Sequence, residues 1–284
     1  MELSVVVPAF NAAETIGEQL EALAAQITQL DAEVVVVDNR STDATADIVR
    51  RRAATAPWLR LVSAPDRAGP GHARNVGVAH ARADRIAFCD SDDIVADGWV
   101  RTMVDSLGRH ELVTGLLELD ELNDSDGGTQ RGSPRTDAAS YYGLFPYVAS
   151  GNCAVRRTTF EGLGGFDEDL DACEDIELSL RARLAGIVVG FDPAAIVHYR
   201  YRHRPSELFR QGRSYGRGRV DIARRMKLAG LERPSWYAGW KSWLWLAVNA
   251  PRAATGRGRR AVAWVAGNRL GHLEASVRTG VVLL

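Results

Sequence analysis

The chain has 284 residues, of which 46% are hydrophobic and 25% charged, and its formal net charge is -1. A chain of this length can bury a core without disulfides or a structural metal. The near-zero charge argues against a basic nucleic-acid-binding coat, and three scattered cysteines argue against a disulfide framework and a CxxC zinc site. The first residues lack the basic start and apolar run of a secretory signal, and no stretch is long enough to span a bilayer. We therefore expect a cytoplasmic protein.

Charge is unevenly distributed along the chain. Residues 1–190 carry 17 basic and 31 acidic residues, whereas residues 191–284 carry 18 basic and 5 acidic residues. An asymmetry of this kind is informative about organisation. We expect one domain over residues 1–202 and a basic, mainly helical C-terminal extension over residues 203–284.

Short apolar runs alternate with helical patterns over the first ninety residues. This alternation predicts an α/β fold with a mostly parallel central sheet flanked by helices. The four consecutive valines at 34–37 favour a strand that is covered on both faces. The predicted strands are 3–7, 33–37, 59–63 and 85–89, and the predicted helices are 12–29, 41–55 (with Ser41 or Thr42 as N-cap) and 71–83.

The pattern is looser after residue 93. The stretch 123–134 is rich in Asn, Asp, Ser and Gly, which predicts a mobile loop. Helices are predicted at 97–109 and 174–185, and strands at 112–117, 150–156 and 187–191.

Acidic residues follow two of the predicted strands directly. Asp38 follows the second strand, and the run Asp90-Ser91-Asp92-Asp93 follows the fourth. In open α/β sheets, ligands bind at the carboxyl ends of the strands. Three carboxylates in four residues repel one another, so the site needs a cation, and Mg²⁺ or Mn²⁺ prefers such oxygen ligands. The alternative is a solvated acidic loop.

A glycine turn precedes the third predicted helix. Gly69-Pro70-Gly71 suits a phosphate held on backbone amides at the helix N-terminus, and Arg74 suits a forked contact to phosphate. The rival interpretation is the G-x-G-x-x-G turn of a Rossmann-type NAD-binding protein. It is disfavoured because Arg74 occupies the third glycine position and the turn does not follow the first strand.

Two further positions carry chemistry. Glu174 and Asp175 open a helix, where a carboxylate serves either as a general base for a hydroxyl or simply as a partner of the helix dipole. His198 ends an apolar run, where a histidine is either structural or a metal ligand.

Six segments follow one another between residues 3 and 200, namely Val5–Asn11, Val36–Asp43, Ala73–Gly77, Phe88–Asp93, Ser150–Arg157 and Gly164–Asp175. Together, and in this order, they resemble the family-2 glycosyltransferases of GT-A fold. In the second segment, Asn39-Arg40 replaces the commoner Asp-Gly, which leaves the shape of the nucleotide pocket open.

This resemblance implies a bacterial, metal-dependent enzyme that transfers a sugar, with inversion, from a nucleotide-diphosphate sugar to an acceptor hydroxyl, in cell-surface glycan, glycolipid or natural-product glycosylation. It implies that Asp175, beside Glu174, is the catalytic base that deprotonates the acceptor. On the donor, it implies that Asp38 contacts the nucleobase, Arg74 the diphosphate and Asp90 the ribose side. Asp92 and His198 are implied to hold Mn²⁺ or Mg²⁺. The implied donor-binding residues are Pro8, Phe10, Asn11, Asp38, Arg74, Asp90, Gly151 and Asn152. The alternative is a non-catalytic, nucleotide-binding scaffold of the same fold, which would be expected to lose Asp92 or Asp175.

The C-terminal extension has two features of its own. Its arginines at 210–219 suit a donor diphosphate or an anionic acceptor. Trp236, Trp240 and Trp243 share one helical face beside further arginines. That face favours either peripheral contact with the cytoplasmic side of a membrane or packing against the core or a second copy in a homodimer.

Overall fold

The computed structural model describes residues 1–123, 137–232 and 239–283, and these residues form two compact units. The sheet unit comprises Met1–Leu122, the described part of Ser133–Asp169, and Glu174–Arg200. The helical unit comprises the described residues from Tyr201 onward, together with Asn123 and Leu170–Cys173. The domain boundary after residue 202 stays a prediction. Trp236 and most of the predicted loop at 123–134 lie outside the described residues.

The sheet unit is built on one mixed sheet. Its strands are β1 (Leu3–Ala9), β2 (Ala32–Asp38), β3 (Leu59–Ser63), β4 (Arg85–Cys89), β5 (Ile94–Val95), β6 (Leu112–Glu118), β9 (Asn152–Arg156) and β10 (Val189–His198). Their order is β3-β2-β1-β4-β9-β6-β10-β5. β1 to β4 are mutually parallel, β9 runs antiparallel between β4 and β6, and β10 runs parallel to β6. The predicted α/β class is confirmed.

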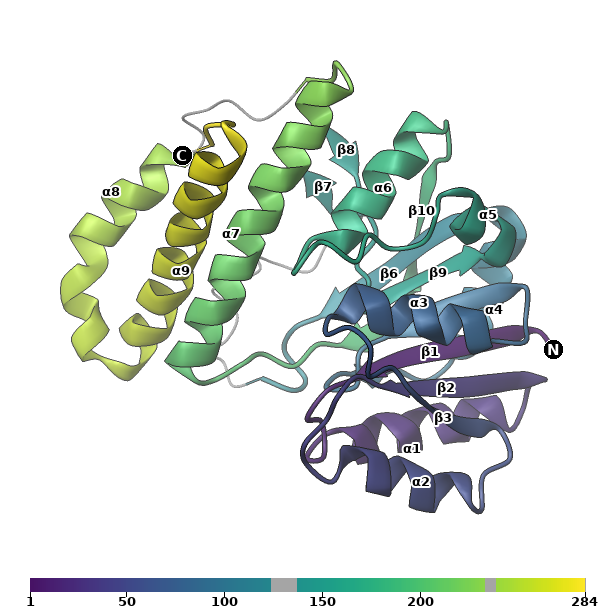
Figure 1. The fold of residues 1–284 in the computed structure, drawn as a ribbon. Coiled ribbons are helices and arrows are strands. Elements are labelled where there is room, and N and C mark those ends of the chain that lie inside the picture. The colour runs from purple at the N-terminus through teal and green to yellow at the C-terminus, as the bar shows by residue number, and fades with distance from the viewer. Residues whose placement is uncertain (124–136, 233–238, 284) are drawn as a thin grey trace. The chain divides into compact units, whose positions relative to one another are not determined.

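Helices cover both faces of this sheet (Figure 1). One face carries α1 (Ile16–Ile27), α2 (Thr45–Ala53) and α4 (Trp99–Arg109), and the other carries α3 (Pro70–His80), α5 (Arg157–Gly162) and α6 (Glu174–Leu184). A hairpin of β7 (Ser140–Tyr141) and β8 (Phe145–Pro146) lies outside the main sheet. The inner strands are therefore buried on both faces, as the valine run at 34–37 predicted.

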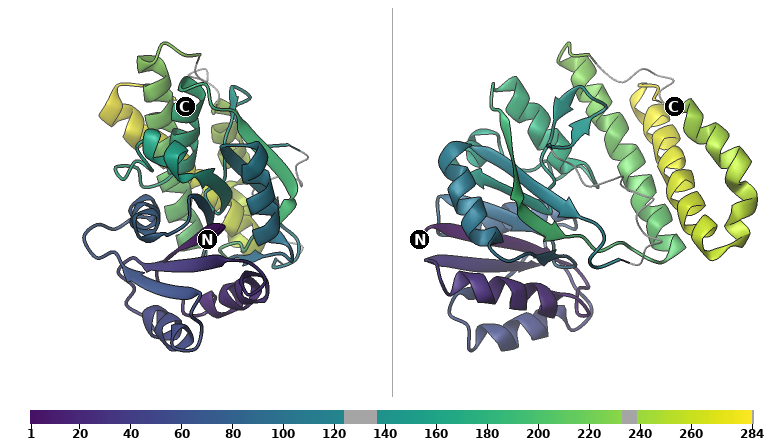
Figure 2. Two further views of the ribbon diagram at one scale, coloured as in Figure 1. Left: turned by 90° about the vertical axis from the view of Figure 1, so that its right-hand side faces the viewer. Right: turned by 180° about the vertical axis from the view of Figure 1, so that it is seen from behind.

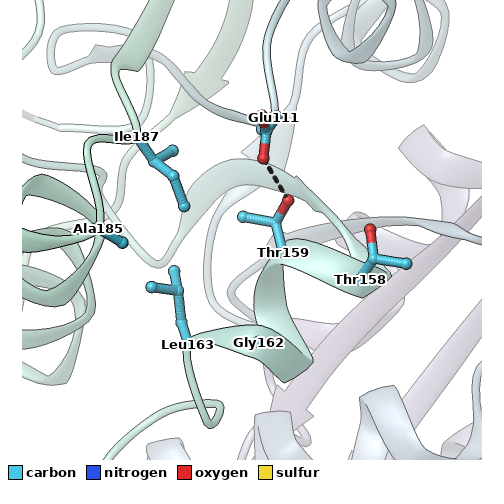
Figure 3. Close-up of a pocket in the computed structure, with 7 residues that line it drawn as sticks. All are labelled: Glu111, Thr158, Thr159, Gly162, Leu163, Ala185 and Ile187. Carbon is cyan, nitrogen blue, oxygen red and sulfur yellow. Dashed lines mark hydrogen bonds between the residues drawn. The ribbon is translucent and has the colours of Figure 1, made fainter.

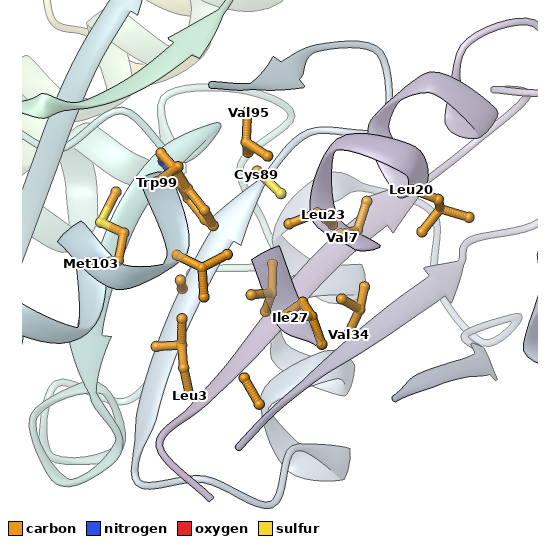
Figure 4. Close-up of a cluster of buried hydrophobic side chains, with 14 of the residues drawn as sticks. Leu3, Val7, Leu20, Leu23, Ile27, Val34, Cys89, Val95, Trp99 and Met103 are labelled. Atoms are coloured by element: carbon orange, nitrogen blue, oxygen red, sulfur yellow. The ribbon is translucent and has the colours of Figure 1, made fainter. Parts of the chain in front are cut away.

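The core consists of one apolar cluster on each face of the sheet. Because strand side chains alternate, Val5 and Val7 of β1 enter the cluster under α1, whereas Val6 enters the other. Figure 4 shows side chains of α1 and α4 packed around β1 and β2 in the first cluster. Burial of each large side chain contributes about 1.5–3 kcal/mol. The helical side chains include Leu20, Leu23, Ile27, Trp99, Met103 and Leu107.

The second helix begins later than predicted, at Thr45, and the N-cap prediction is wrong. Neither Ser41 nor Thr42 caps it. The Ser41 hydroxyl accepts a hydrogen bond from the Asn11 N–H, and the Thr42 N–H donates to the Asn11 side chain. These polar residues therefore tie two loops together instead of starting the helix.

The helical unit contains α7 (Pro205–Leu228), α8 (Trp240–Asn249), a 3₁₀ turn (Ala250–Ala254) and α9 (Gly256–Thr279). This confirms the predicted helical extension. In Figure 1 and in the right-hand view of Figure 2, α7 and α9 lie side by side. They touch through their backbones, because a Cβ at Gly212 would lie 2.4 Å from the Trp264 carbonyl oxygen and one at Gly216 would lie 2.2 Å from that of Asn268. Across the described ranges, every helix is too short or too polar to span a bilayer.

Candidate functional site

The loops that follow β1 and β2 lie side by side at the carboxyl edge of the sheet. The strand register places Ala9 opposite Asp38. Beyond it, the Asn11 N–H donates to the Ser41 hydroxyl over 3.0 Å, and the Asn11 side-chain oxygen accepts from the Thr42 N–H over 2.8 Å. Four of the predicted donor-binding residues are thus brought to one edge, namely Pro8, Phe10, Asn11 and Asp38.

Asn39 organises the turn that precedes α3. Its side-chain amide donates to the carbonyl oxygens of Ala64 and Arg67, each at a distance of 2.7 Å. Its side-chain oxygen accepts from the Gly69 N–H at a distance of 2.9 Å. An aspartate, the commoner residue here, has no hydrogen to donate to the two carbonyls. The asparagine is therefore matched to this chain's own loop, which sequence reasoning did not foresee.

Arg40 explains why glycine is the commoner residue beside Asn39. Its φ is +71°, in the left-handed region that glycine enters without steric cost. The departure from Asp-Gly thus leaves the backbone turn in place and adds an exposed cationic side chain to the loop that follows β2.

The aspartate run after β4 forms a compact group of carboxylates. Each of Asp90, Asp92 and Asp93 offers an oxygen, and these atoms lie within 4.8 Å of one another. Two polar side chains hold the backbone of the run: the amide of Gln19 in α1 donates to the Asp90 carbonyl oxygen, and the hydroxyl of Thr15, the residue before α1, donates to that of Ser91, both at a distance of 3.0 Å. Gln19 was missed by sequence reasoning, although a polar residue within the apolar stripe of a helix is a usable signal.

His198 lies beside the aspartate run because of a strand pairing. β10 pairs antiparallel with β5, which places His198 opposite Ile94, the residue after Asp93. The His198 Nδ1 lies 2.9 Å from a Glu118 carboxylate oxygen. Burial alone would raise the pKa of Glu118, but hydrogen bonds from His198 and from two backbone N–H groups outweigh it and lower that pKa. A carboxylate that fixes an imidazole in this way is typical of metal-ligating histidines.

Arg200, two residues after the end of β10, makes further contacts with the run. Its backbone N–H donates to the Asp93 carboxylate over 2.8 Å, and its Nε donates to the Asp92 carbonyl over 3.0 Å. Asp93 is almost completely buried, so this bond offsets part of the cost of its desolvation.

Arg74 connects the aspartate run to the start of α6. Its guanidinium is 3% exposed and donates to a carboxylate oxygen of Asp90 at a distance of 2.6 Å and to one of Glu174 at 2.8 Å. Burial would lower the pKa of Arg74, but the two carboxylates outweigh it and raise the pKa above its usual range. Arg74 is thus a buried cation with two acidic partners at the end of β4.

Glu174 and Asp175 stand at the first turn of α6, with Ser150 against them. The Ser150 N–H donates to one Asp175 carboxylate oxygen over 3.1 Å, and the Ile176 N–H donates to the other over 2.8 Å. Burial, followed by repulsion from Asp175, raises the pKa of Glu174 to about 7, although Arg74 acts in the opposite direction. The partly exposed Asp175 is therefore oriented by the backbone, whereas Glu174 is enclosed.

Gly151 and Asn152 occupy different environments. A Cβ at Gly151 would lie 2.6 Å from an Asp90 carboxylate oxygen, so only glycine fits there without movement. Asn152 is completely buried: its amide donates to the carbonyls of Leu116 and Ala195, and its oxygen accepts from the Trp99 indole over 2.8 Å. The Asn152 side chain is therefore bonded within the protein.

A cavity of about 350 Å³ lies elsewhere, near the amino ends of β6 and β10 (Figure 3). The Thr159 hydroxyl donates to Glu111 across it over 2.8 Å. None of its lining residues belongs to the predicted site, which lies at the opposite edge of the sheet. The lining residues are Glu111, Thr158, Thr159, Gly162, Leu163, Ala185 and Ile187.

A family model matches more than half of the chain. Residues 4–164 match the model described as glycosyl transferase family 2. This range contains β1 to β4, the aspartate run, Arg74 and Gly151, and it ends before Glu174.

Several curated proteins are similar to this chain. The succinoglycan biosynthesis protein ExoA of Rhizobium meliloti is 27% identical over 229 residues, which cover 76% of this chain and 68% of ExoA. The glycosyltransferase AglE of Haloferax volcanii is 28% identical over 237 residues, 78% of this chain and 73% of AglE. The succinoglycan biosynthesis protein ExoO of Rhizobium meliloti is 41% identical, but over 104 residues, 37% of this chain and only 29% of ExoO.

Solved structures share the fold across nearly the whole chain. The mannosyltransferase PcManGT from Pyrobaculum calidifontis, in complex with GDP-Man and Mn²⁺, superposes with a TM-score of 0.68 at 21% identity and covers 96% of this chain and 86% of its own. Residues 1–349 of TarS from S. aureus, in complex with UDP-GlcNAc, give a TM-score of 0.59 at 19% identity, and the match covers 99% of this chain and 92% of the TarS chain. At these identities the likeness shows the fold, which is that of GT-A glycosyltransferases.

Proposed function

The chain belongs to glycosyl transferase family 2 and is a glycosyltransferase, and from this premise we propose that it moves a sugar from a nucleotide-diphosphate sugar to an acceptor hydroxyl, with the aid of a divalent cation and with inversion. The observation that carries the proposal is the link from the aspartate run, through the buried Arg74, to Glu174, the residue before Asp175, at the carboxyl edge of the sheet. This edge is where α/β sheets bind ligands.

We assign the nucleotide to the loops after β1 and β2. Phe10 is 62% exposed at this edge, which leaves its ring available to a base. The carboxylate of Asp38 accepts hydrogen bonds, and base N–H groups donate them. PcManGT binds GDP-Man and TarS binds UDP-GlcNAc, so the shared fold alone does not select the nucleotide of this chain.

The aspartate run fits a divalent cation. Its donors are carboxylate oxygens, which Mg²⁺ and Mn²⁺ prefer, and three mutually repelling carboxylates gain from a positive charge. Asp93 is almost completely buried, whereas Asp92 is partly exposed, so we assign Asp92 as the principal ligand, with His198 contributed from the strand that pairs next to the run. When bound, such a cation supplies charge stabilisation for the departing diphosphate.

We assign Asp175 as the base. Its carboxylate is held by two backbone N–H groups and is partly exposed, so it is oriented and accessible to an acceptor hydroxyl. It takes the proton of that hydroxyl while the hydroxyl oxygen forms the new bond to the anomeric carbon and the bond from that carbon to the diphosphate oxygen breaks. A single displacement of this kind inverts the anomeric centre.

The remaining predicted donor residues receive supporting roles. We propose that Arg74 acts on the donor through Asp90, because both of its terminal nitrogens are bonded to carboxylates. Gly151 lets the β9 loop approach Asp90. Asn152 ties β6, β10 and α4 together under the site.

A thermal-shift screen with UDP, GDP and dTDP, each with and without Mn²⁺, tests the proposal. We expect at least one nucleotide to raise the melting temperature, and to raise it more with Mn²⁺, because a ligand that binds only the folded state stabilises it. Asp92→Asn should remove the Mn²⁺-dependent part, whereas Asp105→Asn, at an exposed position of α4, should not. If no nucleotide shifts the melting temperature under any metal condition, the proposed donor site is wrong.

We also propose that α8 rests on an anionic membrane surface. One face of this helix exposes Trp240 (50%), Leu244 (54%) and Val248 (69%), at the spacing of a helical stripe. Among residues 239–283 the sequence has one acidic residue, Glu274, which pairs with Arg213. Exposed tryptophan beside basic residues suits an anionic lipid interface. The nearby basic residues are Lys241, Arg252, Arg259 and Arg260.

Sedimentation with lipid vesicles tests this contact. At low salt we expect the protein to sediment with phosphatidylglycerol vesicles but not with phosphatidylcholine vesicles, and the double variant Trp240→Ser/Trp243→Ser to stay in the supernatant. Absence of binding to both vesicle types would contradict the proposal. Self-association that the same double variant abolishes would indicate instead that this face packs against a second copy.

A further inference from the structure

The residues just before Glu174 belong to the helical unit, although the chain on both sides of them belongs to the sheet unit. Leu170–Cys173 groups with α7 and α9, whereas Asp169 and Glu174 group with the sheet. The chain thus joins the helical unit for these residues and returns to the sheet unit at the first residue of α6. The proposed base, Asp175, is one residue beyond this return point.

Segment 170–173 is in backbone contact with α7 at Gly218. A Cβ at Gly218 would lie 2.4 Å from the Ala172 carbonyl oxygen and 3.0 Å from both the Cβ and the Sγ of Cys173. The first distance is shorter than real Cβ contacts, and its partner is backbone, which has no flexible end to move aside. A side chain at position 218 would therefore displace segment 170–173.

Two side-chain contacts hold the same segment on α7. The Arg217 guanidinium donates to the Asp171 carboxylate over 2.7 Å, and the Cys173 Sγ lies 3.9 Å from the Tyr215 carbonyl oxygen. Cys173 is buried and has a φ of +67°. A residue with a Cβ enters this left-handed region only where its surroundings hold it there.

Different glycines of α7 serve its contact with α9. Gly212 and Gly216 face the backbone of α9, whereas Gly218 faces segment 170–173. The two contacts can therefore be perturbed separately.

We propose that Gly218 is a positioning residue for sugar transfer: the close approach of α7 holds Cys173 in its left-handed conformation and thereby sets how Glu174 and Asp175 enter α6. The inference rests on the proposed function of Asp175. The contacts that a shifted first turn would lengthen are the bond from the Ser150 N–H to Asp175 and the ion pair of Arg74 with Glu174.

The test compares turnover with donor binding in Gly218→Ala. Turnover is the release of nucleoside diphosphate from a panel of UDP- and GDP-sugars, with water taking the sugar in place of the acceptor hydroxyl. The number of donor sites per chain is measured by calorimetry. We expect kcat per donor site to fall by about ten- to hundredfold, the scale of an ångström misplacement of a catalytic group. The KM for donor and the Mn²⁺-dependent thermal shift should stay close to the wild-type values, since the donor loops are untouched.

A matched variant and a rescue separate positioning from stability. Gly212→Ala disturbs the α7–α9 contact instead, so it should lower the melting temperature yet keep kcat per donor site. Cys173→Gly in the Gly218→Ala background removes the two Cys173 atoms that lie 3.0 Å from position 218, and glycine keeps a φ of +67° without strain while the Ala172 carbonyl moves aside. It should therefore restore part of the lost kcat.

The outcomes are distinct. The inference is wrong, while the proposed function stands, if the wild type turns over donor and Gly218→Ala has the same kcat per donor site. The same conclusion follows if Gly218→Ala only has fewer donor sites per chain, as a destabilised protein would. If the wild type neither binds nor turns over any donor, both are overturned.

Discussion

Asp175→Asn is expected to lower sugar transfer by about two to four orders of magnitude, the usual contribution of a general base, while donor binding survives. Asparagine retains an oxygen that can accept the Ser150 N–H, so the first turn of α6 should keep its shape. The amide cannot take a proton from the acceptor. The measurement is the release of nucleoside diphosphate, with donor affinity from calorimetry on the same samples.

A nearby exposed carboxylate provides the control for this result. Asp169 lies in the loop before α6, its side chain is 82% exposed, and it pairs with Arg67. Asp169→Asn should therefore leave transfer unchanged. Transfer by Asp175→Asn at the wild-type rate would show that another group is the base.

Arg74→Met is expected to cost about 3–5 kcal/mol of unfolding free energy, the cost of breaking a buried ion pair by removing one partner. The substitution leaves Asp90 and the enclosed Glu174 without their cation. Urea unfolding of the purified variant measures the loss. A change below about 1 kcal/mol, the range of exposed pairs, would contradict the assignment of Arg74 as the buried link of the site.

Two further variants show whether the loss of unfolding free energy in Arg74→Met comes from breaking a buried ion pair. Arg67→Met removes a half-exposed arginine that pairs with Asp169 and should lower the free energy of unfolding far less than Arg74→Met does, because exposed pairs contribute little. Adding Asp90→Asn and Glu174→Gln to Arg74→Met neutralises the stranded carboxylates and should recover much of the stability. Sugar transfer should not return, since Asp90 belongs to the proposed donor site.

The elements that the sequence predicted well are those with strong local signals. The valines of β2 and the helical pattern at 71–83 place their elements to within a few residues, because burial on both faces, or on one helical face, is written into neighbouring positions. The second helix was placed less well. Its polar start, Ser41-Thr42-Asp43, resembles a helix cap, but these residues bond to the loop after β1, which local pattern cannot reveal.

The site shows the same division. Motif spacing predicted that Asp90, Asp92 and Asp175 carry chemistry. It did not predict that Arg74 would be buried between Asp90 and Glu174. Nor did it predict that β5 would pair Ile94 with His198, or that Gly218 would be in backbone contact with segment 170–173. Each of these depends on contacts between residues far apart in the chain, which are fixed by tertiary packing and leave no periodic pattern in the sequence.

The most direct test of the central claim is the turnover of a nucleotide-sugar panel by the wild-type protein. UDP-, GDP- and dTDP-sugars are incubated with the protein after EDTA treatment, then after addition of Mn²⁺, and the released nucleoside diphosphate is measured. We predict release from at least one donor that EDTA abolishes, that Mn²⁺ restores, and that Asp175→Asn lacks. No release from any donor, or equal release by the wild type and Asp175→Asn, would contradict the account.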